Sequence, residues 1–147
     1  LHINFRRIFM TQSTITRQSV QINQRISHTA KLFGVWFPLN IEPAIYAIAG
    51  NIAPEYSVAY WAFYGLSNGG FYMAPDLDKQ YIVSCINGYE GSISADALGI
   101  TACLYAYSHL SFSSDPALAE VCANHYYWLR EFMLEHAEAG SILKAID

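Results

Sequence analysis

The sequence predicts a single α+β domain, in which an antiparallel β-meander of three or four strands packs with about four to five α-helices. Three observations support this class. The chain has 147 residues, the length of one ordinary domain. Two Asn-Gly pairs separate apolar runs, and helix-capping residues precede the long apolar segments that follow. A composition that is 53% hydrophobic and only 14% charged excludes an intrinsically disordered chain.

The first part of the chain predicts two helices. Apolar residues at helical spacing precede Gly34, a usual helix stop, and predict a short amphipathic helix; they are Val20, Ile22, Ile26, Ala30 and Phe33. Asn40, with Pro43 in the first turn, predicts the cap of a second helix that stops before Pro54. Met10 resembles a natural start, so we interpret residues 1–9 as an upstream extension and residues 10–147 as the domain.

The middle of the chain predicts the strands. Residues 58–66 are rich in Tyr, Trp and Phe, which favour strands, and the Asn68-Gly69 pair that follows is a strong hairpin signal. If this pair forms a two-residue turn, residues 71–74 return as the second strand and Tyr64 faces Met73. A second hairpin is predicted around Asn87-Gly88, between residues 80–86 and 89–93.

The last third predicts helices again. Ser94 caps a helix that runs to about Phe112, and apolar residues on all its sides indicate that it is buried. Asp115 and Pro116 begin a second helix, whose apolar stripe includes His125. We expect His125 to be a hydrogen-bonded core residue. Gly140 ends this region, and Ser141 predicts the cap of a short terminal helix.

Charge and cysteine content exclude several classes of protein. The net charge is −4; residues 1–31 hold five cations and no acid, whereas residues 32–147 hold three cations and twelve acids. This balance argues against a strongly basic nucleic-acid binder. The odd number and wide spacing of Cys85, Cys103 and Cys122 predict neither a disulfide framework nor a zinc site, but buried thiols in a reducing cytoplasm. We expect no metal, no cofactor and no membrane span.

Ser67 raises the possibility of an enzyme. Residues 65–69 match the G-x-S-x-G pattern of a serine hydrolase, and Asp96 and His125 follow in the order that a catalytic triad requires. That nucleophile, however, lies on a turn from a strand into a helix, whereas the residues after Ser67 predict another strand. A small serine hydrolase therefore stays an alternative, and we favour a turn.

The tyrosines raise a second alternative, a weak nucleic-acid-binding accessory protein. An aromatic sheet surface of the kind that stacks bases would use Tyr60, Tyr64, Tyr72 and Tyr89. Such surfaces also need a basic groove, and this region offers only Lys79. We therefore expect these rings to serve the core or a protein interface.

Several blocks of the sequence resemble KlcA/ArdB-type antirestriction proteins. The most specific is Leu-Ser-Asn-Gly-Gly-Phe-Tyr-Met-Ala-Pro at residues 66–75, after Tyr-Trp-Ala-Phe-Tyr at residues 60–64. Weaker similarity lies at residues 88–91, 94–100, 125–126, 129–130 and 145–147. The resemblance implies a small α+β protein, encoded on plasmids, phages and genomic islands, that helps incoming DNA escape type I restriction–modification. It implies no catalytic residues.

We therefore expect a non-enzymatic cytoplasmic antirestriction protein. Its expected partner is a subunit of the restriction–modification enzyme or a host factor that controls restriction, with no small-molecule substrate. Twelve acids are too few for DNA mimicry, which requires about one negative charge per 1.7 Å. The candidate contact residues are Tyr64, Ser67, Asn68, Gly69, Gly70 and Asp76. Turn formation alone also explains Asn68-Gly69, and we favour it over a contact role. Because Asp-Gly supports the same turn, Asn68→Asp tests the two interpretations. Unchanged stability with lost plasmid protection would favour contact, and full protection would remove Asn68 from the site.

Overall fold

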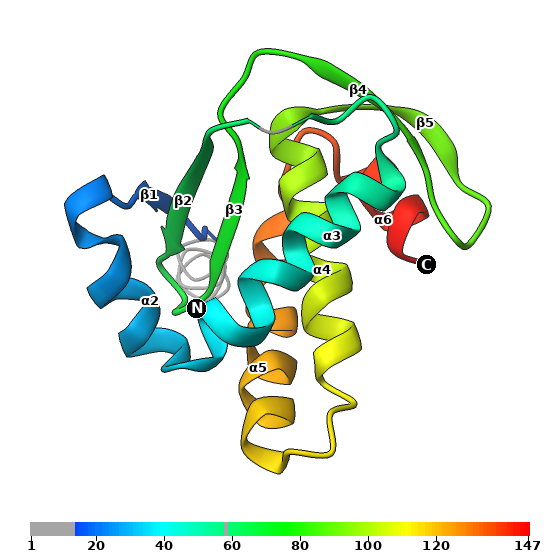
Figure 1. The fold of residues 1–147 in the computed structure, drawn as a ribbon. Coiled ribbons are helices and arrows are strands. Elements are labelled where there is room, and N and C mark those ends of the chain that lie inside the picture. Colours follow the sequence, from blue (N-terminus) through cyan, green and yellow to red (C-terminus); the bar gives the residue numbers. More distant parts are fainter. Residues whose placement is uncertain (1–13, 58) are drawn as a thin grey trace, which may run out of the picture.

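The computed structural model describes residues 14–57 and 59–147 and confirms the α+β class (Figure 1). Residues 1–9, interpreted above as an upstream extension, lie outside the described residues. The helical elements are η1 (Ile22–Gln24), α2 (Arg25–Phe33), η2 (Phe37–Ile41), α3 (Glu42–Ile52), α4 (Ala95–Leu110), α5 (Pro116–Met133) and α6 (Ala139–Ile146). The strands are β1 (Arg17–Ser19), β2 (Trp61–Leu66), β3 (Phe71–Pro75), β4 (Gln80–Ser84) and β5 (Glu90–Ser94).

Helix α4 lies at the centre of the molecule. Ser94 begins it as predicted, since the Ser94 hydroxyl accepts a hydrogen bond from the Ala97 amide at 3.1 Å. The helix is buried on nearly all sides, because it contacts α3, α5, α6 and strand β3 (Figure 1). It approaches β3 closely at Gly99, where a Cβ atom would lie 2.4 Å from the Met73 carbonyl oxygen.

The strands form two antiparallel sheets, β1-β2-β3 and β4-β5, and not one continuous meander. The reason is that α4 covers the outer edge of β3. The Tyr107 hydroxyl donates to the Phe71 carbonyl at 2.8 Å, and the Cys103 thiol lies 3.6 Å from the Met73 carbonyl. These carbonyls are therefore not free to pair with β4, and the chain passes through residues 76–79 to a separate hairpin.

Both hairpins turn through three residues, which corrects the predicted two-residue turn. Gly69 and Gly88 have φ values of 99° and 91°, whereas no described residue other than glycine has a positive φ. Each asparagine therefore keeps an ordinary backbone, and only the glycine after it is left-handed, a common three-residue loop. The register shifts by one residue, so that Tyr64 faces Tyr72 and not Met73.

The region before α3 differs most from the prediction. Strand β1 is exposed and pairs with β2, and no sequence pattern predicted it. Helix α2 ends at Gly34 as predicted, and Phe33 of the predicted apolar stripe is buried. Ile26 of that stripe is 87% exposed, however, and Thr29 is buried instead. Asn40 caps no helix, because the π-helical turn η2 runs directly into α3.

The C-terminal helices largely follow the prediction. Asp115 caps α5, and the stripe with Leu118, Cys122, His125, Leu129 and Met133 is buried. Helix α6 begins at Ala139, so Gly140 and Ser141 lie inside it and not at its boundary. The three cysteines are buried and free, and burial raises the pKa of Cys103 to about 12.

Taken singly, the helices within residues 14–57 and 59–147 all fail the length and hydropathy requirements for crossing a bilayer. The pair Ile22–Phe33 and Phe37–Ile52, bent by 95°, meets them by length and composition when the two are joined.

Candidate functional site

Side chains from five separate segments converge beside the first turn of α4. We call this group the Asp96 cluster, and its members are Arg17 (β1), Tyr64 (β2), Tyr72 (β3), Asp96 (α4) and His136 (between α5 and α6). The capped start of α4 fixes Asp96, and the register of β2 on β3 places the two tyrosines next to each other. The cluster thus joins segments far apart along the chain.

Asp96 accepts three hydrogen bonds. Its Oδ1 atom accepts from Arg17 Nη1 and from the Tyr72 hydroxyl, each at 2.8 Å, and its Oδ2 atom lies 2.8 Å from His136 Nε2. Burial by itself raises the pKa of Asp96, but the hydrogen bonds from His136 and Tyr72 and the charge of Arg17 outweigh it. The pKa therefore falls below its ordinary value of 3.8, and the group is a carboxylate at neutral pH.

Both ring nitrogens of His136 are occupied. The Glu138 amide donates to Nδ1 at 2.9 Å, which assigns the ring proton to Nε2, so Nε2 donates to Asp96. Glu138 itself accepts hydrogen bonds from the amide and the hydroxyl of Ser94. Neither nitrogen of His136 is free to accept a proton from a substrate.

Aromatic rings complete the Asp96 cluster. The Arg17 guanidinium lies 4.2 Å from the centre of the Tyr64 ring, and Tyr64 stacks on Tyr72 with 5.0 Å between ring centres. Tyr72 is fully buried, and burial together with the charge of Asp96 raises its pKa, so it stays a phenol that donates to Asp96. The cluster clamps β1 to α4 and to the segment before α6.

Asp96→Asn is expected to lower the free energy of unfolding by about 1–3 kcal/mol. The amide has one oxygen where the carboxylate has two, so it cannot accept from both Tyr72 and His136. Urea denaturation at pH 7 measures the change, and Asp78→Asn, at an exposed turn residue, is the control. Equal effects of the two substitutions would contradict the structural role of the Asp96 carboxylate.

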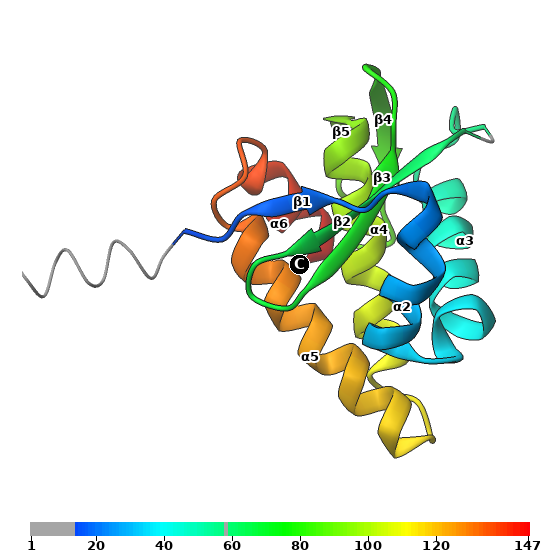
Figure 2. The same ribbon diagram turned by 90° about the vertical axis from the view of Figure 1, so that its left-hand side faces the viewer.

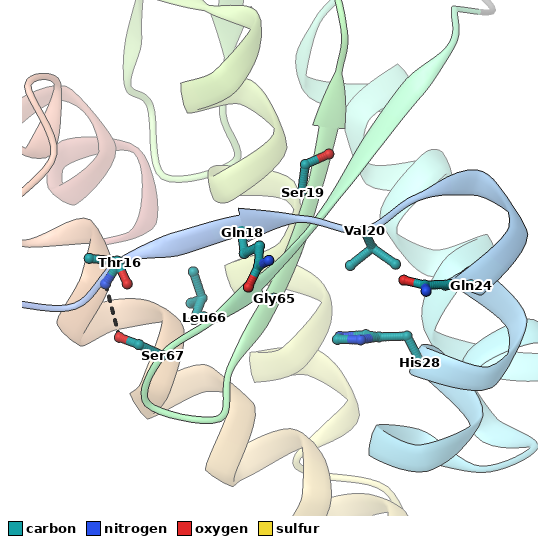
Figure 3. A pocket seen from close by; sticks show the side chains of 9 residues that line it. All are labelled: Thr16, Gln18, Ser19, Val20, Gln24, His28, Gly65, Leu66 and Ser67. Atoms are coloured by element: carbon teal, nitrogen blue, oxygen red, sulfur yellow. Dashed lines mark hydrogen bonds between the residues drawn. The ribbon is translucent and has the colours of Figure 1, made fainter.

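Ser67, the candidate nucleophile, lies in a turn. Its hydroxyl accepts from the Thr16 amide at 2.9 Å, and its own amide donates to the Thr16 carbonyl at the same distance. Figure 3 shows Ser67 and His28 at opposite ends of a hollow of about 330 Å³, with Gly65 and Gln18 between them. The described residues thus place no imidazole in hydrogen bond with Ser67.

The other two expected triad members are also apart from Ser67. Asp96 bonds to His136, and His125 lies in the core between Phe33 and Trp128, with ring-centre distances of 4.3 and 5.0 Å. His125 is buried as predicted, but its Nδ1 atom has no hydrogen-bond partner among the described residues, which corrects the expected bond. Burial alone lowers its pKa to about 4, so it is neutral at pH 7.

The hairpin tip is tied to α5 by Asn68. Its Oδ1 atom accepts from the Gly70 amide at 3.0 Å, and its Nδ2 atom donates to the Trp128 carbonyl at 2.9 Å. Asn87 repeats the arrangement: it accepts from the Tyr89 amide and donates to the Lys144 carbonyl in α6. Each Asn-Gly pair therefore closes its own turn and fastens that turn to a helix.

Asn68→Asp is accordingly expected to destabilise the protein by about 1–3 kcal/mol. Aspartate keeps the turn but loses the Nδ2 donor and sets a charged oxygen against the Trp128 carbonyl. Asn87→Asp should act in the same direction, whereas Asn124→Asp, on the exposed side of α5, should not. Thermal unfolding of the three variants tests this, and similar melting temperatures would contradict it.

The predicted contact residues do not converge. Ser67 and Gly69 are exposed at the hairpin tip, but Gly70 is buried against Trp128, where a Cβ atom would lie 2.9 Å from that side chain. Asp76 is exposed at the far end of β3, a strand-length of about 16 Å from the tip. Tyr64 belongs to the Asp96 cluster. A partner role for these residues stays a prediction.

The tyrosines form no open platform for nucleic-acid bases. Tyr72 is fully buried under Tyr64, Tyr89 is half-buried, and Tyr60 is held by a hydrogen bond from Arg25 at 2.8 Å.

Sequence reasoning missed Arg17, Tyr72 and His136 as a group. Their separation along the chain hid them, since each one alone is an ordinary residue of its element. One signal was present: Asp96 is the only Asp, Glu, Lys or Arg from residue 91 to residue 114. A lone charge on a buried helix needs partners.

Comparisons with known proteins agree on one family. The family model described as "Antirestriction protein" matches residues 54–147. The chain is 36% identical over 135 residues to the antirestriction protein KlcA of Escherichia coli, covering 90% of this chain and 95% of KlcA. It is 38% identical over 139 residues to the uncharacterised protein YafX of E. coli K12, covering 90% and 88%.

Its fold is similar to a solved KlcA/ArdB structure, with a TM-score of 0.82, 37% identity, and coverage of 90% of this chain and 95% of that one. KlcA and ArdB are described there as having a novel fold and antirestriction activity against type I DNA restriction systems in vivo but not in vitro. The family model, the KlcA relatives and the matching fold show that this chain belongs to the antirestriction protein family.

Proposed function

We propose that this protein protects incoming DNA from type I restriction in the bacterial cytoplasm by contacting another protein, and that it catalyses no reaction. Its membership of the antirestriction family carries the proposal. The geometry supports the second part, because two side chains with catalytic potential, Ser67 and His136, form hydrogen bonds within the chain. Ser67 bonds to the backbone of Thr16, and His136 uses both nitrogens.

We further propose that the partner is a host factor that controls restriction, and not the restriction enzyme alone. The solved relatives act in vivo but not in vitro. An inhibitor that bound the enzyme itself would also act on the purified enzyme, so this difference supports a component that only the cell supplies. A subunit of the restriction enzyme stays the other candidate.

Two assays test this proposal together. In cells with a type I system, expression of this chain should raise the plating efficiency of unmodified phage toward that of modified phage. With a purified type I enzyme, the purified chain should leave DNA cleavage unchanged, and addition of extract from a restriction-deficient host should restore inhibition.

A cell without the type I system is the control for the plating assay, and extract without this chain is the control for cleavage. Inhibition of the purified enzyme without extract would show that the partner is the restriction enzyme itself and not a host factor. Unchanged plating of unmodified phage would overturn the proposed function.

A further inference from the structure

An apolar groove is lined by residues of α2, η2 and α3, and none of its lining residues belongs to the Asp96 cluster. Helices α2 and α3 lie on the opposite side of the molecule from α6 (Figure 2). Its volume is about 640 Å³. The aromatic side chains of Phe37 and Phe63, both nearly buried, belong to the core and also line the groove. Ile26 and Val35 line it as well, and they are 87% and 68% exposed.

The exposure of Ile26 and Val35 is unfavourable for an unbound protein. Burying each one would contribute about 1.5–3 kcal/mol, because apolar surface leaves water. Exposed apolar residues scattered singly are ordinary, but these two line one concave surface together with Ala30 and Pro38. A concave surface of this kind is suited to receive apolar side chains from another molecule.

The charges of the groove indicate what the partner must carry. Arg25 Nη2 donates to the Tyr60 hydroxyl and to the Trp61 carbonyl, and the guanidinium lies 4.2 Å from the centre of the Phe63 ring. Its Nε atom is buried and has no hydrogen-bond partner among the described residues. Glu42, on the α3 side, makes no salt bridge with any described residue. Burial raises the pKa of Glu42 against the opposing charge of Arg25, so its carboxylate is partly dehydrated and would gain from a cation.

The groove also favours a helical over an extended partner segment. It is lined mainly by residues of helices α2 and α3 and the turn η2, in which the backbone groups are bonded within the elements. An extended peptide would find no strand edge there and would leave its own amides and carbonyls unpaired. A helix brings those groups already satisfied and presents only side chains.

We propose that this groove binds an amphipathic helix of a partner protein, with the apolar face of that helix on Ile26 and Val35 and a lysine or arginine at its edge beside Glu42. The identity of the partner rests on the function proposed above. The chemistry of the groove does not, and it can be measured separately.

The direct test uses two synthetic helical peptides of about 18 residues, one of leucine and lysine and one of leucine and glutamate. Fluorescence anisotropy should show the lysine peptide binding about tenfold more tightly than the glutamate peptide. Glu42→Lys should reverse this preference. Glu131→Lys makes the same change of charge on α5 and should leave the preference in place, which controls for the overall acidity of the chain.

The apolar contact is tested with Ile26→Asp and Val35→Asp, which change exposed residues and should leave the thermal unfolding midpoint nearly unchanged. Each should weaken lysine-peptide binding at least about tenfold. Ile86→Asp is the matched control, because Ile86 is 98% exposed on the other hairpin. If all three variants bind the peptide equally well, the groove is not the binding surface.

Plating assays with the same variants separate this inference from the proposed function. Loss of protection in Ile26→Asp and Glu42→Lys, with protection kept in Ile86→Asp and Glu131→Lys, is the expected result. Protection that survives in every variant while peptide binding is lost would overturn the groove as the partner site and leave the function intact.

Two other occupants would also overturn the proposal. If the protein sediments with phosphatidylcholine vesicles and Ile26→Asp abolishes this, the groove binds a membrane surface. A concentration-dependent dimer in analytical ultracentrifugation that Ile26→Asp dissociates would assign it to a second copy of this chain.

Discussion

Gly99→Ala is expected to destabilise the protein by more than about 3 kcal/mol. A Cβ atom at this position would lie 2.3 Å from Ala74 Cβ and 2.4 Å from Ala74 Cα, in addition to its clash with the Met73 carbonyl oxygen. These are mainly backbone contacts, which no change of side-chain rotamer can relieve. Helix α4 would therefore have to move away from β3, and the hydrogen bond from Tyr107 to Phe71 would stretch with it.

Gly50→Ala is the matched control, since Gly50 is also in a helix but has no atom within 4 Å of an added Cβ. Alanine favours the helix there, so this variant should be more stable by about 0.5–1 kcal/mol. Urea denaturation of both variants measures the change in the free energy of unfolding, which should fall for Gly99→Ala and rise for Gly50→Ala. A Gly99→Ala protein with the urea midpoint of the unaltered chain would show that α4 and β3 do not make this contact.

His125 is expected to make the protein acid-labile between pH 6.5 and pH 4. Its pKa is about 4 in the fold against 6.5 for the exposed group, because the imidazole is buried among aromatic rings. As the pH falls below 6.5, the unfolded chain takes up a proton that the folded chain does not, so unfolding becomes more favourable. This shift in the pKa of His125 lowers the free energy of unfolding by about 2 kcal/mol between pH 7.5 and pH 5.

His125→Leu should remove most of this dependence, because leucine has a similar size and does not titrate. The measurement is the free energy of unfolding in urea at pH 7.5 and pH 5. His109→Leu, at an exposed position, is the control and should keep the full dependence. Asp96 affects stability at lower pH. Because its pKa is lowered in the fold, the stability that its carboxylate contributes is lost only as the pH falls below about 3.8. Equal pH dependence in both leucine variants would contradict the role given to His125.

The elements that the sequence predicted best are those decided by local chemistry. Ser94 and Asp115 cap helices through bonds to amides only two or three residues ahead, so the capping pattern was enough to place α4 and α5. Gly34 likewise ended α2. The burial of α4 also followed from its composition, because a helix that is apolar on every side has to be covered.

The parts that could not be predicted depend on distant partners. Strand β1 has no alternating pattern and exists because β2 offers it a free edge. The hairpin register depends on whether the loop holds two or three residues, and Asn-Gly supports both. The Asp96 cluster joins Arg17 to His136, and no periodicity connects residues at such a separation.

The covering of β3 by α4 leaves β1 as the open edge of the three-stranded sheet. An open edge is a template for pairing with another chain, and in many proteins it is where aggregation begins. Here the edge strand is only three residues long and carries the charged Arg17. Both properties discourage growth of the sheet from one molecule into the next, so within the described residues the exposed edge of this sheet is protected against fibrous association.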